Sequence, residues 1–375
     1  MATTPGGSDE TGCAEPGRHP DGRLAVSVLR VRGYALPDGD PVDLYADGDQ
    51  WTTDGVASAE LAAEGWLVPG LGDAHTHPGA EAPGQALDES LLRDDLHEHV
   101  AAGVTMIRSP GLAGDPPAWF GRDSDVPRGV HAGMWIAQHG QFFDGWGRRA
   151  SHAELPAVAA AQAARTGWAK LIGDWGPDDE PIPPAVLTAV VAAVHAAGGR
   201  VAVHSQQAAG GAAAVAAQVD SLEHGMCLDP GLLAQMAAQG TALTPTLAVI
   251  SATLQDVATR PDGPRKDWYL GGASVHGELA AAAAEAGVTV LAGTDSRPHG
   301  RIATEIRALA AAGLRPHDAL AAGSWAARSY LGLPGLVPGG PADAVVYDAD
   351  PRTDLDQLDH PRAVVLRGKL RYRRP

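Results

Sequence analysis

Cysteine is nearly absent: Cys13 and Cys227 are the two thiols in 375 residues. Two thiols so far apart do not form a disulfide framework, which argues against a small disulfide-stabilised fold and fits a reducing compartment. Long hydrophobic runs are missing too, since no window approaches the ~18 apolar residues of a membrane-spanning helix. We therefore expect a cytoplasmic protein with no membrane partner.

Basic charge is scarce as well. The chain has 28 Lys and Arg against 45 Asp and Glu, a formal net charge of −17. Nucleic-acid binders usually present a basic face, so this balance argues against a nucleic-acid partner. The dense basic stretch "RGKLRYRR" lies at the C-terminal end, where solvation explains it. We expect a small-molecule substrate, and the sequence leaves open whether the chain forms a homo-oligomer.

The two ends of the chain differ from its middle. Residues 1–22 are polar and rich in Gly and Pro, without the apolar core of a signal peptide, and we expect a disordered leader there. Residues 23–66 and 335–375 contain short apolar runs separated by turn residues, which predict short strands. The simplest arrangement is a small β-domain that both ends of the chain build together.

Residues 67–334 alternate short apolar runs with Ala-rich helical stretches. The predicted helices include Leu87–Ala102, Pro183–Ala197 and Leu270–Ala286, and several end near a Gly that supplies a left-handed cap. The predicted strands are "WLVPGLGDAHTH", "GVTMIRSP", "GVHAGMWIAQ", "GWAKLIGDW", "RVAVHSQ", "VDSLEH", "TALTPTL" and "GVTVLAGTD". Such strand–helix units are typical of a (β/α)8 TIM barrel, an α/β fold. A doubly wound open sheet fits less well, because no glycine-rich phosphate loop follows the first strand.

The first predicted strand ends in two histidines, in the stretch "LVPGLGDAHTHPG". Residues i and i+2 of a strand point the same way, so His75 and His77 face one space, where two imidazoles can chelate one metal ion. The sequence "HEH" repeats this spacing at His97 and His99. It falls in a predicted helix, where i and i+2 do not share a face, so we expect both histidines to be exposed surface residues without a ligand role.

Four further strands carry a residue able to bind metal near the carboxyl end: Lys170, His204, His224 and Asp295. Active sites of barrels form at that rim, from the ends of several strands. A single strand histidine is more often structural, but ligand-type residues at matching depth on five strands indicate one metal centre. The aliphatic neighbours in "VAVHS" and "VDSLEH" would also make an unpartnered polar group costly.

Lys170 permits two interpretations. Divalent cations would repel its ammonium group, so an unmodified lysine is not a ligand. If the amine captures carbon dioxide, the resulting carbamate is an anion that can bridge two metals. Alternatively, Lys170 forms an ion pair with Asp174, which lies four residues further on the same face.

The motifs "PGLGDAHTHP", "KLIGDW", "VAVHS", "SLEHG" and "LAGTDS", in this order, resemble the metal-dependent amidohydrolase superfamily. The nearest branch is that of prolidase-like dipeptidases and imidazolonepropionase-related amide hydrolases. The resemblance runs from Leu67 to Leu331, and it implies a small β-sandwich domain beside the barrel.

The resemblance also implies ligands for two divalent metal ions, with zinc expected although the family accepts other divalent ions. The ligands are His75, His77 and Asp295 for the more buried ion, His204 and His224 for the second, and carboxylated Lys170 as the bridge. A hydroxide held between the metals would attack a carbonyl carbon, because metal binding lowers the pKa of water from about 15.7 to about 7. Asp295 would take its proton and pass it to the leaving group.

Two segments near the rim bear on the substrate. His139, after the third strand, resembles the substrate-orienting histidine of the family; a loop histidine without that role is the alternative. Its segment "AQHGQFFDGWG" is more aromatic than expected of a simple dipeptidase, which suggests a bulky or aromatic acyl or amine group. The candidates for an apolar wall are Phe142, Phe143, Trp146 and Trp175. For a substrate carboxylate, "DSRPHGR" offers Arg297, His299 and Arg301.

Three functions remain. The favoured one is a hydrolase of an amide or related carbonyl bond in a dipeptide, an N-acyl amino acid or a cyclic amide. The second uses one metal ion, with Lys170 structural, for deamination or opening of a heterocyclic ring. The third is a non-catalytic scaffold, which the retention of all predicted ligands disfavours.

Overall fold

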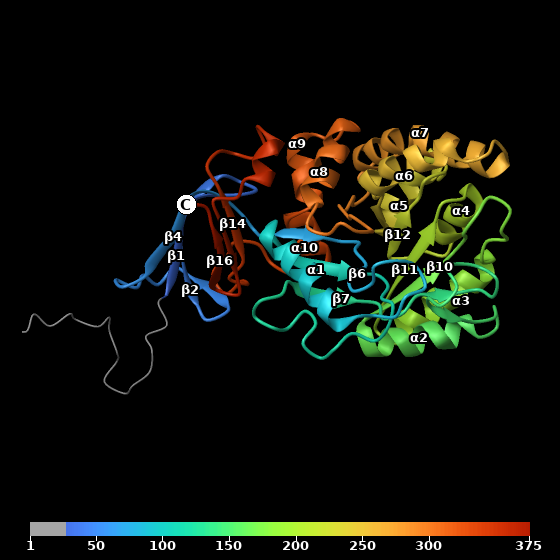
Figure 1. Ribbon diagram of the computed structural model, residues 1–375, viewed down its shortest axis with the longest axis horizontal. Coiled ribbons are helices and arrows are strands. Elements are labelled where there is room, and N and C mark those ends of the chain that lie inside the picture. The colour runs from blue at the N-terminus through green and yellow to red at the C-terminus, as the bar shows by residue number, and fades with distance from the viewer. Residues whose placement is uncertain (1–27) are drawn as a thin grey trace, which may run out of the picture.

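The computed structural model describes residues 28–375. The predicted leader, 1–22, lies outside the described residues, as do the first positions, 23–27, of the predicted β-domain. The described chain has two parts, a small sheet and a larger α/β part beside it (Figure 1). No described helix is long and apolar enough to cross a membrane.

Segments from both ends of the described chain build the small sheet. Its order is β16-β15-β14-β4-β1-β2-β3, and Figure 1 shows blue strands from the start of the chain beside red strands from its end. The strands are β1 (Leu29–Ala35), β2 (Asp40–Asp47), β3 (Gln50–Thr52), β4 (Glu60–Val68), β14 (Ala344–Tyr347), β15 (Ala363–Leu366) and β16 (Lys369–Arg373). They form one sheet of seven strands, so the second sheet of a β-sandwich stays a prediction.

The boundary between the two parts lies slightly later than predicted. Leu67 and Val68, expected at the start of the barrel, belong to β4 and pair with Val346 and Val345 of β14. Their side chains are fully buried. The α/β part therefore begins after Val68 rather than at residue 67.

The α/β part contains two parallel sheets, of order β5-β6-β7 and β13-β12-β11-β10-β8-β9. Their strands are β5 (Leu71–Asp73), β6 (Val104–Ser109), β7 (Arg128–His131), β8 (Ile136–Ala137), β9 (Arg148–Arg149), β10 (Trp168–Ile172), β11 (Arg200–Ser205), β12 (Ser221–His224) and β13 (Ala242–Thr244). Isolated parallel bridges continue the pairing, at Leu112–Met134, Leu243–Val290 and Thr76–Asp295. These bridges place the two sheets in one barrel-like succession.

The first predicted strand, 66–77, is divided between β4 and β5, and two further predicted strands also differ from the structure. The third, residues 129–138, is divided into β7 and β8, because Gly133 adopts a positive φ of 70° that a regular strand does not contain. The eighth, residues 287–295, has no continuous strand. It meets its neighbours through the single bridges at Val290 and Asp295 instead.

Helices alternate with the strands of the α/β part. They are α1 (Glu89–Ala101), α2 (Leu155–Thr166), α3 (Pro184–Ala196), α4 (Ala208–Ala216), α5 (Leu233–Gln239), α6 (Leu247–Thr259), α7 (Pro264–Glu285), α8 (Ile302–Ala311), α9 (Pro316–Ala322) and α10 (Trp325–Tyr330), with short 3-10 turns at Pro230–Leu232 and Leu355–Asp359. The first two predicted helices are present as α1 and α3. The third, α7, begins at Pro264 rather than Leu270, because Pro is well tolerated in the first turn.

The strand register brings the polar strand ends to one rim. Ile172 at the end of β10 pairs with His204 of β11, and Ser205 of β11 pairs with His224 at the end of β12. The bridge between Thr76 and Asp295 lies beyond the end of β5. The predicted metal ligands therefore share one edge of the α/β part.

Candidate metal centre and cavity

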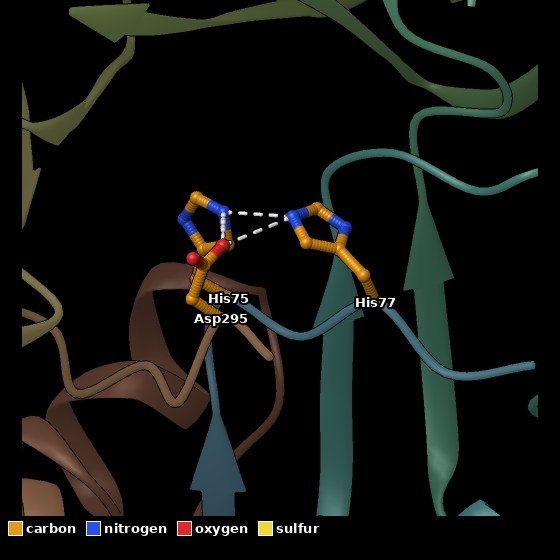
Figure 2. Close-up of side chains that lie close together, drawn as sticks. All are labelled: His75, His77 and Asp295. Carbon is orange, nitrogen blue, oxygen red and sulfur yellow. Dashed lines mark hydrogen bonds and ion pairs between the residues drawn. The ribbon is translucent and has the colours of Figure 1, made fainter. Parts of the chain in front are cut away.

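Three of the predicted ligands contact one another directly. His75 Nε2 lies 3.1 Å from both His77 Nε2 and Asp295 Oδ1, and His77 Nε2 lies 3.2 Å from that oxygen. Figure 2 shows the three side chains pointing toward one another. Among residues 28–375, this is the one group of three potential ligands with all ligand atoms within 4.8 Å of each other.

The Nδ1 atoms of both imidazoles, which point away from this group, have hydrogen-bond partners of their own. His75 Nδ1 lies 2.6 Å from Glu223 Oε2, and His77 Nδ1 lies 2.7 Å from the carbonyl oxygen of Gly111. Both partners are acceptors, so each Nδ1 carries the proton and each Nε2 presents a lone pair. Two lone pairs and a carboxylate oxygen in contact call for a cation. Ligands ~2.0–2.1 Å from a tetrahedral zinc ion stand ~3.3 Å apart, which fits the observed spacing.

The backbone adopts an uncommon conformation at this site. Asp295, His224 and Thr246 have positive φ angles of 62°, 65° and 54°. Side chains other than Gly seldom adopt this left-handed region, and such residues cluster at functional sites. The backbone N–H of Asp295 donates to the carbonyl oxygen of His75 at 2.6 Å. This bond holds the turn against the segment after β5, so the carboxylate faces the two histidines.

Lys170, on β10, is buried beside the predicted histidine ligands. It is 1% exposed, and its Nζ has no hydrogen-bond partner among residues 28–375; Nε2 of His204, on β11, is likewise buried without a partner in that part of the chain. The alternative ion pair with Asp174 is wrong, because Asp174 accepts hydrogen bonds from Ser205 Oγ at 2.5 Å and Gln206 N at 2.8 Å. A buried amine without a partner is costly, and a ligand role would remove that cost.

Burial favours the neutral forms of the remaining predicted ligands, His204, His224 and Lys170. The rings of His204 and His224 lie 4.6 Å apart, and those of His224 and His75 lie 5.1 Å apart. Burial lowers the pKa of His204 to about 3, and burial together with His204 lowers the pKa of His224. Neutral imidazole is the form that binds metal. Burial also lowers the pKa of the Lys170 amine to about 8, which favours the free amine that carbamate formation requires.

A cavity of about 700 Å³ opens over these ligands. The predicted aromatic residues line it together with Trp135; we call this set the aromatic wall, and it comprises Trp135, Phe142, Phe143, Trp146 and Trp175. The wall reaches the metal ligands. The Trp135 ring lies 5.0 Å from that of His77, and the Trp175 ring lies 5.2 Å from that of His204.

Helices α6 and α7 contribute apolar and basic residues to the same cavity. Ile250, Trp268 and Tyr269 line it, and three cations stand near them: Arg260, Arg265 and Lys266. Arg260 pairs with Asp256, and Lys266 pairs with Asp262. Arg265 forms no ion pair with any acidic side chain of residues 28–375.

The other predicted substrate residues occupy different positions. Arg297 lines the cavity, but its guanidinium pairs with Asp95. His299 is buried outside the cavity lining, so the structure does not bring it to the substrate space. His139 and Arg301 are exposed and do not line the cavity either. His139 lies in the turn after β8, where Gly140 has a positive φ of 81°.

The prediction that His97 and His99 are both exposed surface residues is wrong for His99. Both lie on α1, where His97 is exposed and pairs with Asp125. His99 is fully buried, and its Nε2 lies 3.3 Å from Thr76 Oγ1. The spacing argument excludes that the two histidines share one metal ion, but it does not decide which of them faces the interior.

Two buried charged residues behind His75, Glu223 and Arg108, were not predicted from the sequence. Both are buried, and Arg108 Nη2 lies 2.9 Å from Glu223 Oε1. Burial would raise the pKa of Glu223, but the charge of Arg108 holds it well below its usual value, so a carboxylate faces His75. The signal was present in the sequence: each is a lone charge within an apolar strand, in "SLEH" and "VTMIRS".

The chain is similar to known proteins over most of its length. Residues 66–371 match the Amidohydrolase family. A protein of Mycobacterium tuberculosis (strain ATCC 25618 / H37Rv), itself uncharacterised, is 38% identical over 360 residues, which are 91% of this chain and 95% of that protein.

Solved structures show the same fold at lower identity. A crystal structure of a Xaa-Pro dipeptidase with bound methionine in the active site matches with a TM-score of 0.78 at 21% identity, over 92% of this chain and 100% of that one. The crystal structure of A. niger ochratoxinase matches with a TM-score of 0.77 at 22% identity, over 92% and 96%. Both likenesses indicate a TIM-barrel-like α/β fold.

Proposed function

Because the chain belongs to the amidohydrolase family, a group of metal-dependent hydrolases that act on carbon–nitrogen bonds, we propose that it cleaves the amide bond of an N-acyl amino acid or dipeptide carrying a bulky aromatic group. The observation that carries this proposal is the contact of His75, His77 and Asp295 in one cavity with the aromatic wall.

Six side chains of the cavity would hold two divalent ions, with zinc as the expected metal. They are His75, His77 and Asp295 for one ion, His204 and His224 for the other, and carboxylated Lys170 between them. Ions bound there supply polarisation of the substrate carbonyl and a water of lowered pKa. The protein itself supplies the orientation of the ligands, through Glu223 behind His75 and the Gly111 carbonyl behind His77.

Asp295 is placed to move the proton. Burial would raise the pKa of its carboxyl group, but His75 and His77 outweigh burial and hold it well below its usual value. The group is therefore a carboxylate at neutral pH. Its Oδ1 contacts both histidines, which leaves Oδ2 to accept a proton from the attacking water and return it to the leaving nitrogen.

The dimensions of the cavity favour a substrate larger than a pair of small amino acids. Its volume of about 700 Å³ is typical of sites for drug-sized molecules. The aromatic wall stands against His77 and His204, so a substrate ring would stack close to the scissile bond. Arg265, which has no ion-pair partner among residues 28–375, also lines the cavity and is suited to a substrate carboxylate, which Arg297, paired with Asp95, is not.

The test is hydrolysis of matched amides by zinc-loaded protein. We expect N-aromatic acyl amino acids to be cleaved with a kcat/KM ~5-fold or more above the N-acetyl forms, since stacking on the wall contributes ~1 kcal/mol or more. Asp295→Asn should lose activity on all of them. If the protein binds zinc but hydrolyses none of these amides, the proposal is contradicted.

One observation favours a second candidate, a deaminase or heterocyclic ring hydrolase with a single ion. The ligand atoms of His75, His77 and Asp295 alone form a compact group among residues 28–375. In that case Lys170 is structural. Aminated and cyclic amide substrates belong in the same assay, with release of ammonia or ring opening as the signal for this candidate.

A further inference from the structure

Helix α1 carries two polar residues, Asp95 and His99, on its buried face. Both are fully buried. They are four residues apart and therefore lie on the same side of the helix. Their neighbours Asp94 and His97 are exposed, as polar residues of a surface helix normally are. A buried carboxylate and a buried imidazole need partners inside the protein.

Asp95 joins the two loops that carry metal ligands. Its Oδ2 accepts a hydrogen bond of 2.8 Å from the backbone N–H of Gly79, on the loop that follows β5. The same carboxylate pairs with Arg297 and lies 3.3 Å from His299 Nε2, both on the loop that precedes α8. One buried carboxylate therefore connects the loop of the two histidine ligands with the loop of the aspartate ligand.

His99 contacts the residue between the two histidine ligands. Thr76 Oγ1 lies 3.3 Å from His99 Nε2 and 3.1 Å from His299 Nδ1. One assignment of protons satisfies all of these contacts. His99 Nε2 donates to the hydroxyl of Thr76, which donates to His299 Nδ1. The Nε2–H of His299 then faces the carboxylate of Asp95. Burial lowers the pKa of His99 to about 3, so its imidazole is neutral, as this order requires.

The backbone brings the same two loops against α1. Thr76 pairs with Asp295 in a parallel bridge. Gly300, with φ of 71°, lies so close to α1 that a Cβ there would stand 2.6 Å from the carbonyl oxygen of Glu98. The side-chain contacts thus lie over a tightly packed junction of three segments.

We propose that Asp95, His99 and His299 are positioning residues that hold the His75–His77 segment and the Asp295 segment at metal-binding distance. None of the three lines the cavity. The inference rests on the proposed metal centre and adds to it a structural cause for the contact between its ligands. It gives His299, expected from the sequence at the substrate, a place behind the metal site instead.

The test is zinc binding by metal-stripped protein, in competition with a chromophoric chelator. Asp95→Asn and His99→Gln should weaken zinc binding ~10–100-fold, as loss of a residue that orients ligands commonly does. The matched controls are Asp94→Asn and His97→Gln, which make the same changes on the exposed side of α1, and they should leave the affinity unchanged.

A second pair of variants separates positioning from folding. Thr76→Val removes the hydroxyl that both imidazoles contact, and Thr76→Ser retains it. We expect Val, but not Ser, to weaken zinc binding and to alter the visible spectrum of the cobalt(II)-substituted protein, which reports ligand geometry. If Asp95→Asn fails to fold, the comparison of Thr76→Val with Thr76→Ser still tests the positioning role.

The outcomes distinguish this inference from the proposed function. Zinc affinity and cobalt spectra of Asp95→Asn, His99→Gln and Thr76→Val equal to those of the natural protein would overturn the positioning role and leave the metal centre intact. Failure of the natural protein itself to bind zinc would instead overturn the proposed metal centre, and the positioning role with it.

Discussion

In the proposed metal centre, Lys170 is the residue whose chemistry decides how many metal ions bind. Its amine is buried without a partner, and burial lowers its pKa to about 8. We expect Lys170→Ala to reduce bound zinc from about two equivalents per chain to about one, because the anionic bridge is lost. Metal analysis after dialysis measures this, and a short carboxylic acid that enters the vacated space should restore both zinc and activity.

Lys266→Ala is the matched control for Lys170→Ala. Lys266 lines the same cavity but pairs with Asp262 at 2.9 Å, so its removal should leave the zinc content unchanged. A Lys170→Ala protein that keeps its full zinc content, with no response to carboxylic acids, would show that Lys170 is structural. The single-ion candidate would then be preferred.

Glu223 should affect metal binding through His75. Its carboxylate lies 2.6 Å from His75 Nδ1 and is held by Arg108. In Glu223→Gln the neutral amide orients the imidazole less well, so zinc affinity should fall ~10–100-fold. Chelator competition measures this. Ser221→Ala, which removes a hydroxyl donor to Glu223 but keeps its charge, should have the smaller effect; equal affinity of Glu223→Gln and the natural protein would contradict the prediction.

Sequence reasoning at this scale succeeds where strand periodicity alone decides the direction of a side chain. Strand alternation and the shared rim of strand ends placed His75, His77 and Asp295 together, although these residues lie just beyond β5 and in a segment that forms only single bridges. His299 and His139 lie in loops, whose course depends on packing with other segments. The burial of His99 depends on which face of α1 meets Thr76, a tertiary contact with no signature in the spacing.

At the scale of elements, the strands and helices were predicted where the apolar pattern is regular. The helices α1 and α3 and the strands β10, β11 and β12 follow such patterns. The third predicted strand looked continuous because its apolar residues do not reveal the left-handed backbone at Gly133. The eighth, 287–295, is apolar enough for a strand, but its backbone meets each neighbouring strand at one bridge only.

Gly293 in this eighth segment is needed for close approach to β5. A Cβ at Gly293 would lie 2.5 Å from the Cβ of His75 and 2.8 Å from Thr244 Cγ2. Gly293→Ala should therefore displace His75 from Asp295 and weaken zinc binding. We also expect a loss of ~1–3 kcal/mol in the free energy of unfolding, as overpacking of a core produces. Zinc titration and urea unfolding measure the two effects.

Gly271→Ala is the control for this prediction. Gly271 lies inside α7, and an added Cβ would meet no atom within 4 Å. Alanine there should stabilise the protein by ~0.4–1 kcal/mol, because it restricts the unfolded chain, and zinc affinity should not change. If Gly293→Ala behaves like Gly271→Ala, the segment is looser than its contacts indicate.

At the scale of the whole molecule, an ion-pair cluster joins the small sheet to the α/β part. Asp343, just before β14, pairs with Arg128 of β7 at 2.8 Å and with Arg328 of α10 at 3.1 Å. Asp343 and Arg328 are each 1% exposed. Burial would raise the pKa of Asp343, but the charges of Arg328 and Arg128 outweigh it and lower the pKa below its usual value.

Because of this cluster, the free energy of unfolding should decrease as the pH falls. A carboxyl group with a lowered pKa in the folded state contributes stability above its ordinary pKa, and loses it as pH falls through the folded pKa. Asp343→Asn leaves Arg328 buried without its counter-charge, which should cost ~3–5 kcal/mol at pH 7, and the difference from the natural protein should shrink toward pH 3. Urea unfolding at both pH values measures this.

Asp348→Asn, which removes an exposed partner of Arg362, should cost only ~0–1 kcal/mol. A constant difference between Asp343→Asn and the natural protein across this pH range would mean that the carboxylate charge does not hold the two parts together.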